Sequence, residues 1–443
     1  MLPQFRTEPD PYQIPKLEIH REDFDGFLEE LKAFHGHFHE CFSRKEVREN
    51  FFEYMVGQFS PLERKSIEPI ALAVSSRSVR AMQRTVSELS WDEDKMLTTY
   101  HQLFAEDLGQ ADGVLIFDES GFVKKGRESA GVARQYCGAA GKVENCQVGV
   151  FAAYASRKGY GLLDARLYLP EKWLTSEYRQ RRVKCQIPEQ LKFKTKPQLA
   201  EEIFLELVNQ DRIAFRYIVA DTVYGDNPDF IETMEQAYGK TYFLAVSKDT
   251  LFWLRRPETQ VRTYSYRGKV HTKTVVKPAE KSPMTVAQFA GQLNDFFWYR
   301  RKVSEGSQGP IVYEFTRRKI FLARQGLAWM PVFLVIRRTL GDNPEYSYFI
   351  SNAPESTRLE TFVWLSGIRW AVEQCFEETK TELGMDHYEV RKLPAWKHHI
   401  MTSMLAHFFL WHLMIRLGKK ISRYYIAPIT ETFANCFAGQ EVR

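Results

Sequence analysis

The chain has 443 residues, 44% hydrophobic and 26% charged, which is the balance of an ordinary globular protein. The formal net charge of +5 is mildly basic and does not by itself require a nucleic-acid partner. The six cysteines form no Cys-x-x-Cys pair, which argues against a zinc ribbon or a disulfide scaffold and favours a reducing cytoplasm. No apolar run approaches the roughly 18 residues that span a bilayer, so we expect no membrane segment.

Residues 1–107 are predicted to be helical. Apolar side chains recur there at helical spacing, at Phe24, Phe27, Leu28, Leu31 and Phe34. The sequence Ser60-Pro61-Leu62-Glu63 predicts a helix start, with serine as N-cap, proline in the first position and glutamate three residues after the cap.

An α/β pattern begins at Gly113. Residues 114–117 form a short apolar run that ends at Asp118, which is typical of a buried strand. A second such run, residues 213–220, ends at Asp221. The other predicted elements are strands at 147–154, 162–169 and 242–246, the first two completing an antiparallel meander, and a helix at 196–210.

Residues 249–352 interrupt this pattern and are predicted to be mostly β, with one helix at 285–294. Beyond Pro354 the chain is predicted to be helical again, over 358–383 and 394–417. The sequence thus predicts four regions: 1–107, 108–248, 249–352 and 353–443.

Three acidic residues carry the candidate chemistry. Asp118 and Asp221 follow apolar strands, and Glu373 lies on a predicted helix. Phosphoryl transfer on DNA requires two hard cations about 4 Å apart, and carboxylate oxygens are ligands that Mg²⁺ prefers. Each acid also has a structural interpretation, since a strand-end aspartate often forms a turn or caps a helix. Glu373 could equally be one exposed helix charge among Glu377, Glu378 and Glu382.

The predicted helix places two cations beside Glu373. Arg369 lies four residues before it and Lys380 seven after it, which puts all three on one face of a continuous helix. That arrangement would hold a metal and grip phosphates on both sides. Two ordinary salt bridges along the helix are the alternative.

These motifs resemble those of bacterial insertion-sequence transposases with an Asp-Asp-Glu triad. The pattern Arg-x3-Glu-x6-Lys is similar to the signature around the family's catalytic glutamate. Asp118-Glu119-Ser120-Gly121-Phe122 resembles the first aspartate block and Ala220-Asp221-Thr222-Val223-Tyr224-Gly225-Asp226 the second. Segments 135–147 and 64–68 resemble further parts of one subgroup.

The resemblance implies an α/β fold with an RNase H-like (retroviral-integrase-like) core, a mostly β insertion and an N-terminal all-α DNA-binding domain. It implies that Asp118, Asp221 and Glu373 bind two Mg²⁺ ions, for which Mn²⁺ can substitute. Cleavage at transposon ends and strand transfer into target DNA would follow. The expected partners are double-stranded DNA, as terminal inverted repeats and target, and a second copy in a homodimer on paired ends. The expected location is the bacterial cytoplasm, at the nucleoid.

Other residues are predicted to contact DNA. Ser366 stands where the family's fuller signature has tyrosine, so it could donate a hydrogen bond to phosphate but could not stack. Trp298 is the candidate base stacker in an aromatic and basic run, for which a core strand with a basic turn is the alternative. The remaining candidates for phosphate contact are Arg369, Lys380, Lys124, Lys125, Arg134, Arg300 and Arg301.

Two rival functions remain open on the sequence. One is a nuclease of the same fold that cuts DNA without joining it. The other is a domesticated DNA-binding protein without catalysis.

Overall fold

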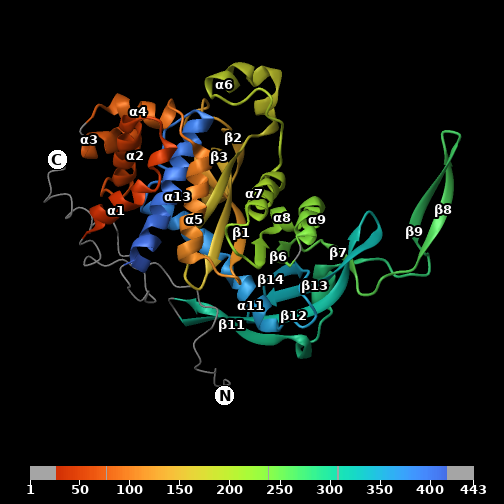
Figure 1. Cartoon of the computed structure of the whole chain (residues 1–443). Helices are drawn as coiled ribbons and strands as arrows, with labels where there is room; N and C mark the ends of the chain where they lie inside the picture. The colour runs from red at the N-terminus through yellow and green to blue at the C-terminus, as the bar shows by residue number, and fades with distance from the viewer. Residues whose placement is uncertain (1–25, 76, 238, 307–308, 417–443) are drawn as a thin grey trace. The chain divides into compact units, whose positions relative to one another are not determined.

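The computed structural model of the chain describes residues 26–75, 77–237, 239–306 and 309–416 (Figure 1). It is a mixed α/β structure whose described residues divide into two compact units. The first comprises the chain up to Arg216 together with the chain from Trp370 onward, and the second comprises Tyr217–Arg369. The predictions for Phe24 and for residue 417 lie outside the described residues, and the division into four regions stays a prediction.

The described chain before the first strand of unit 1 is helical. Its elements are α1 (Phe27–Gly36), η2 (His39–Cys41), α2 (Lys45–Gln58), α3 (Ile67–Val74), α4 (Val79–Ser87) and α5 (Glu93–Leu108). They pack around the long helix α13 (Leu393–Arg416), which Figure 1 draws in blue among them. Phe34 of α1 contacts Phe408 and Phe409 of α13, so residues far apart in sequence share one aromatic core.

The predicted helix start at Ser60 is wrong. α3 begins at Ile67, and the Ser60 hydroxyl instead donates a hydrogen bond of 2.6 Å to the carbonyl of Gly57, near the end of α2. The chain between the two helices is held by Lys65, which is 1% exposed and donates to the carbonyl of Gln58 at 2.9 Å. A capping sequence can serve the preceding helix as well as start a new one, and tertiary contacts decide between them.

The sheet of unit 1 is an antiparallel meander, as predicted. Its strands are β1 (Val114–Val123), β2 (Ala133–Cys137), β3 (Lys142–Ser156) and β4 (Gly159–Tyr168). β3 is central, with β1 on one edge and β4 and β2 on the other. Helices α7 (Lys196–Gln210), at the predicted bounds, and α12 (Trp370–Thr381) pack against β3 and β4. The shorter helices are η3 (Gly138–Ala140), η4 (Glu171–Leu174), η5 (Ser176–Tyr178) and α6 (Arg179–Lys184).

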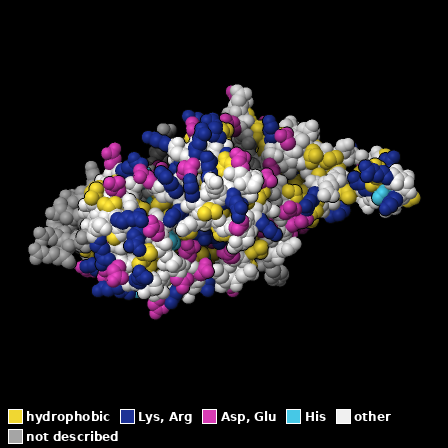
Figure 2. Space-filling model, turned by 90° about the horizontal axis from the view of Figure 1, so that it is seen from above, with side chains coloured by type: hydrophobic (Ala, Val, Ile, Leu, Met, Phe, Trp, Pro, Cys, Tyr) yellow, Lys and Arg dark blue, Asp and Glu magenta, His cyan; other side chains and the backbone are white. Residues whose placement is uncertain are grey.

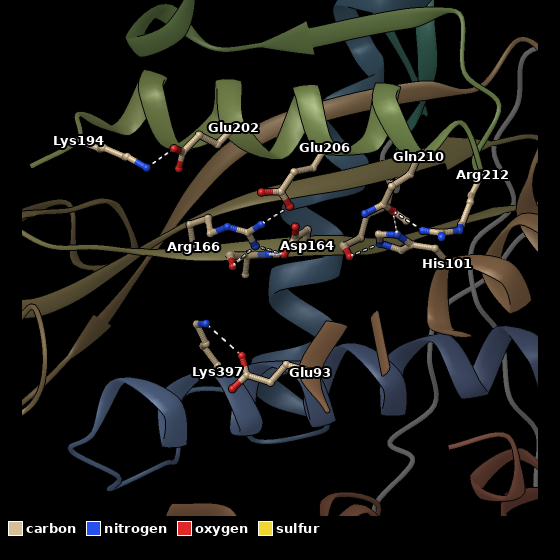
Figure 3. Close-up of polar contacts among 12 residues, drawn as sticks. Glu93, His101, Asp164, Arg166, Lys194, Glu202, Glu206, Gln210, Arg212 and Lys397 are labelled. Carbon is tan, nitrogen blue, oxygen red and sulfur yellow. Dashed lines mark hydrogen bonds and ion pairs between the residues drawn. The ribbon is translucent and has the colours of Figure 1, made fainter. Parts of the chain in front are cut away.

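Polar side chains of α5 and α7 meet residues of β4 (Figure 3). Two carbonyl groups of the strand accept hydrogen bonds from Tyr100 and His101 of α5. Arg166 forms ion pairs with Asp164 of the same strand and with Glu206 of α7. These contacts hold β4 against α5 and α7.

Unit 2 is built on a larger sheet. Its strands are β5 (Tyr217–Ala220), β6 (Thr241–Val246), β7 (Leu251–Trp253), β10 (Met284–Thr285), β11 (Tyr299–Gly306), β12 (Gly309–Arg324), β13 (Leu327–Arg338) and β14 (Tyr346–Ser351). Within unit 2 their order is β10-β7-β12-β13-β14-β6-β5, with β11 paired to β12. β5 and β6 are parallel. A separate sheet contains β8 (Thr259–Tyr266) and β9 (Lys269–Val276).

The helices of unit 2 are α8 (Thr222–Gly225), α9 (Pro228–Gln236), α10 (Val286–Gly291), η6 (Asp295–Phe297) and α11 (Leu359–Ile368). The prediction that residues 249–352 are mostly β is confirmed. The prediction of one helix over 358–383 is wrong, because α11 ends at Ile368 and α12 begins at Trp370. Near that break, Arg337 donates a hydrogen bond of 3.2 Å to the carbonyl of Ser366, an acceptor that a continuous helix would use for its own backbone. None of the helices in the described ranges has the length and apolar character needed to cross a membrane.

The histidines of α13 belong to the core rather than to the surface. His398, His399, His407 and His412 are buried, and each has a polar partner. One ring nitrogen of His399 lies 2.9 Å from the carbonyl of Met385 and must donate, so the other accepts from the hydroxyl of Tyr54 at 2.7 Å. The neutral ring is thus fully hydrogen-bonded, and burial lowers the pKa of His399 to about 3.

This burial predicts an acid sensitivity. The unfolded chain binds a proton at His399 below about pH 6.5, whereas the folded chain does so only near pH 3. Stability therefore falls as the pH drops through that window. Both proteins should lose stability between pH 6.5 and 4.5. The free energy of unfolding of the unsubstituted protein should fall by about 2 to 3 kcal/mol more than that of His399→Gln. Urea titrations at both pH values measure this, and parallel losses would contradict it.

Candidate active site

Asp118 lies in the middle of β1, not at its end. The strand continues to Val123, so the prediction of a strand ending at Asp118 is wrong in its boundary. The side chain is 9% exposed, and one carboxylate oxygen accepts a hydrogen bond of 2.8 Å from the backbone N–H of Glu119. The cross-strand neighbour of Asp118 on β3 is Phe151.

Glu119 is an acidic residue of this strand that sequence reasoning did not single out. Its carboxylate forms an ion pair of 2.6 Å with Lys196 at the start of α7, and both side chains are about four-fifths buried. The sequence pattern indicated Asp118, because this residue directly follows the apolar run. Glu119 is the next residue and lies on the same strand.

Helix α12 runs beside β1 in the same direction. Phe376 packs against Phe151, the cross-strand neighbour of Asp118, with ring centroids 5.1 Å apart. One turn further on, the ammonium group of Lys380 donates a hydrogen bond of 3.1 Å to the carbonyl of Gly121 in β1. The helix that carries the candidate glutamate is thus attached to the strand that carries the candidate aspartate.

Glu373 is an exposed residue near the start of this helix, about 4.5 Å along the axis before Phe376. The rotation of α12 is set on its buried side by Glu378, which is 4% exposed. The Glu378 carboxylate accepts a hydrogen bond from Tyr160 at 2.5 Å and pairs with His407 at 2.6 Å. The interpretation of Glu378 as an exposed helix charge is therefore wrong, because it anchors the helix to β4 and α13.

The ammonium group of Lys380 contacts protein groups. Besides its bond to Gly121, its ammonium lies 5.1 Å from the ring centroid of Phe122. Burial lowers the pKa of Lys380, because charging the amine costs more away from water. Its position links α12 to β1, and its contact with phosphate stays a prediction.

Asp221 follows β5 in unit 2, at the strand end that the sequence predicted. It is the N-cap of α8, and its carboxylate accepts a hydrogen bond of 2.9 Å from the N–H of Val223. The following acid of the motif, Asp226, accepts from the N–H of Ser247 at 2.9 Å. The capping role holds the carboxylate of Asp221 in a defined orientation, which also suits a metal ligand.

Gly225 allows α8 to lie on β6. A Cβ atom at this position would stand 1.9 Å from the carbonyl oxygen of Ala245, a backbone atom that cannot rotate away. We expect Gly225→Ala to lower the midpoint of thermal unfolding by several degrees, since overpacking costs about 1–3 kcal/mol. Gly291→Ala is the matched control in the same unit, because a Cβ there meets nothing within 4 Å. Equal melting temperatures for the two variants would contradict this.

Two predicted DNA contacts of unit 2, Ser366 and Trp298, meet protein partners instead. The hydroxyl of Ser366 is buried and donates to the carbonyl of Val363 at 2.7 Å, so it does not point to solvent. Trp298 is 8% exposed, and the guanidinium of Arg338 lies 4.2 Å from its ring centroid. A base has no open face of Trp298 on which to stack, because this side chain is a core residue. The exposed aromatic residues of this run are Phe296, Phe297 and Tyr299.

Arg300 and Arg301 are partly exposed, and both form ion pairs with acids. Arg300 pairs with Glu314 at 3.1 Å and Arg301 with Glu360 at 3.3 Å. The backbone of Arg369, at the end of α11, keeps helical angles (φ −59°, ψ −22°).

The basic residues after Asp118 fall into two groups. Lys124 is enclosed: its ammonium donates to the carbonyl of Tyr388 at 2.9 Å and lies 3.3 Å from the centroid of that ring. Burial lowers the pKa of Lys124 to about 7, which makes it a poor phosphate contact. Lys125 and Arg134 are exposed and stay candidates for contact with DNA.

Comparisons with known proteins identify a family for this chain. Residues 37–310 match a family model described as "DDE superfamily endonuclease", a span that includes Asp118 and Asp221. Over 187 residues the chain is 29% identical to a protein of Microchaete diplosiphon described as "Probable transposase for insertion sequence element IS701". That match covers 42% of this chain and 46% of the relative, so it spans about half the relative's length. Because the family model covers more than half of the sequence, the chain belongs to the DDE superfamily endonuclease family.

Proposed function

We propose that this protein is a DNA transposase that cuts the ends of a mobile element and joins the freed 3′-hydroxyl groups to target DNA. The family match carries the proposal, together with the attachment of α12 to β1 in unit 1. Because of that attachment, the strand that carries Asp118 and the helix that carries Glu373 are direct neighbours in unit 1.

Asp118, Asp221 and Glu373 would hold two divalent cations. Their donor set consists of carboxylate oxygens, which suits Mg²⁺, with Mn²⁺ as a substitute. When bound, such ions activate the attacking oxygen and stabilise the leaving oxygen. Glu119 is a fourth carboxylate, next to Asp118 on β1, and it is a further candidate ligand.

The other residues would position the DNA. We assign phosphate contact to Arg369 and groove contact to the exposed Lys125 and Arg134, whereas Lys380 would position α12 on β1. The proposed architecture is an RNase H-like core with an N-terminal DNA-binding domain, acting as a homodimer on two paired ends in the bacterial cytoplasm.

One incubation separates this proposal from its rivals. The protein is mixed with Mg²⁺ and a labelled linear duplex carrying the DNA that flanks its coding sequence, and all products are sized. A transposase yields cleaved ends and, when pre-cut ends are supplied, joined products. A nuclease yields cleavage without joining. A domesticated binding protein yields a complex and no cut, which would overturn the proposal.

A further inference from the structure

Strands β8 and β9 form an exposed two-stranded arm, defined here as residues 259–276. They pair only with each other in a sheet of their own, and every residue from Thr259 to Thr274 is exposed. The strands are joined by Arg267 and Gly268, whose φ angles of 49° and 74° are both positive, as in the tight turns that favour hairpins. The arm contributes nothing to the buried core, so its side chains call for another explanation.

The two faces of the arm differ completely in charge. Because side chains alternate along a strand and cross-strand partners share a face, the register assigns each residue to one side. One face carries only uncharged small side chains: Thr259, Val261, Thr263, Ser265, Val270, Thr272, Thr274 and Val276. The other carries the basic and aromatic side chains: Arg262, Tyr264, Tyr266, Lys269, His271 and Lys273, with Gln260 and Val275. We call the second the basic face.

The charge of the arm is entirely positive. Residues 259–276 contain four lysines and arginines and no aspartate or glutamate. The nearest acid in the sequence, Glu258, lies just outside the arm and is paired with Lys277 at 2.6 Å. In Figure 2 the end of the arm shows dark-blue basic side chains around a histidine.

The charges of the basic face lower the stability of the hairpin rather than raise it. Arg262 lies directly opposite Lys273 across the two strands, and like charges in that position are destabilising. An acid at either position would form a favourable cross-strand pair instead. Tyr264 stacks on His271 with centroids 5.6 Å apart, which places flat rings between the cations. The sequence thus concentrates positive charge on one face at a cost to the hairpin itself.

We propose that the basic face of the β8–β9 arm binds the phosphate backbone of double-stranded DNA. The inference rests on the proposed function, which brings the protein to DNA, and it assigns DNA contact to a segment outside the metal-binding residues. A two-stranded β-ribbon fits the major groove of B-DNA, and arginine, lysine and tyrosine side chains are the usual partners of phosphate oxygens. The uncharged face and the absence of acids leave no charge that would repel DNA.

The test compares two triple variants of the full chain. Arg262→Gln with Lys269→Gln and Lys273→Gln removes three cations from the basic face. Thr263→Gln with Thr272→Gln and Thr274→Gln is the control, because it places the same side chains on the opposite face. All six positions are exposed, so both variants should keep the melting temperature of the unsubstituted protein. Binding to a fluorescent 30-base-pair duplex is followed by anisotropy between 50 and 200 mM KCl.

We expect the basic-face variant to bind roughly 10- to 100-fold more weakly near 0.1 M salt, with a slope of log K against log salt reduced by about 2.7. The control should keep the affinity and the slope. Equal slopes for all three proteins would overturn the arm proposal while leaving DNA binding by the rest of the chain intact. A change of oligomeric state in sedimentation without DNA, with unchanged affinity, would assign the arm to a second protein copy and also overturn it. Absence of binding by the unsubstituted protein would instead refute the proposed function.

Discussion

Replacing Asp118 with asparagine should abolish metal-dependent cleavage of end DNA. The substitution keeps the size of the side chain and an oxygen that can accept from the N–H of Glu119, but it removes the negative charge that a divalent cation requires. We expect at least a 1000-fold loss in the cleavage rate, about 4 kcal/mol of transition-state stabilisation. Asp221→Asn and Glu373→Gln should cause losses of similar size, because each removes a ligand of the same proposed cations.

The measurement is the single-turnover rate of cleavage with Mg²⁺, with DNA binding followed in parallel. Glu144→Gln on the adjacent strand β3 is the control, since this partly exposed acid forms its ion pair with Lys142, two residues away on the same strand. Binding should survive in all variants, and chelation of the metal should reproduce the cleavage defect in the unsubstituted protein. Retained cleavage by Asp118→Asn would refute the assignment of Asp118 as a metal ligand. Retained cleavage by Glu373→Gln alone would transfer the third position to another carboxylate, of which Glu119 is the first to examine.

The second large effect is a loss of stability on substitution of Glu378, which in the sequence is one of several acids on the same helix. Its carboxylate is 4% exposed and lies between Tyr160 and His407. Replacement by alanine removes both partners' hydrogen bonds and leaves a cavity between α12, β4 and α13. Breaking a buried pair of this kind costs roughly 3–5 kcal/mol, so we expect a loss of that size in the free energy of unfolding.

Glu377→Ala is the matched control, because Glu377 is the preceding residue of the same helix and is exposed. Its effect on stability should stay within about 0.5 kcal/mol. Urea denaturation at pH 7 measures both. Glu378→Gln, which keeps an acceptor for Tyr160, should be less destabilising than alanine but should slow cleavage, because α12 would lose the anchor that orients Glu373. Similar unfolding energies for the alanine variants at 377 and 378 would contradict this role.

Local sequence patterns predicted most elements whose residues contact mainly their neighbours. Helix α7 has its predicted bounds, and in the structure a capping box of Thr195 and Gln198 begins it. The meander of β1, β3 and β4 was predicted from apolar runs separated by turns. The mostly β character of residues 249–352 was predictable for the same reason. The break at Arg369 was not, because it lies beside a hydrogen bond to the carbonyl of Ser366 from Arg337, 29 residues away.

The candidate site likewise has features that the sequence predicted and features that only the tertiary structure decided. The acids at 118, 221 and 373 could be named from the sequence, since motif spacing reports residue type and order along the chain. Whether a charged side chain is exposed depends on what packs over it from distant segments, and spacing along one element carries no information about that. The burial of Glu378 therefore depends on β4 and α13, the enclosure of Lys124 on Tyr388, and the burial of Trp298 on Arg338 of β13. The order and spacing of the motifs by themselves predicted the family and its chemistry, because they resemble those of known transposases, whereas the tertiary structure decided which charged side chains are buried and stabilise the fold.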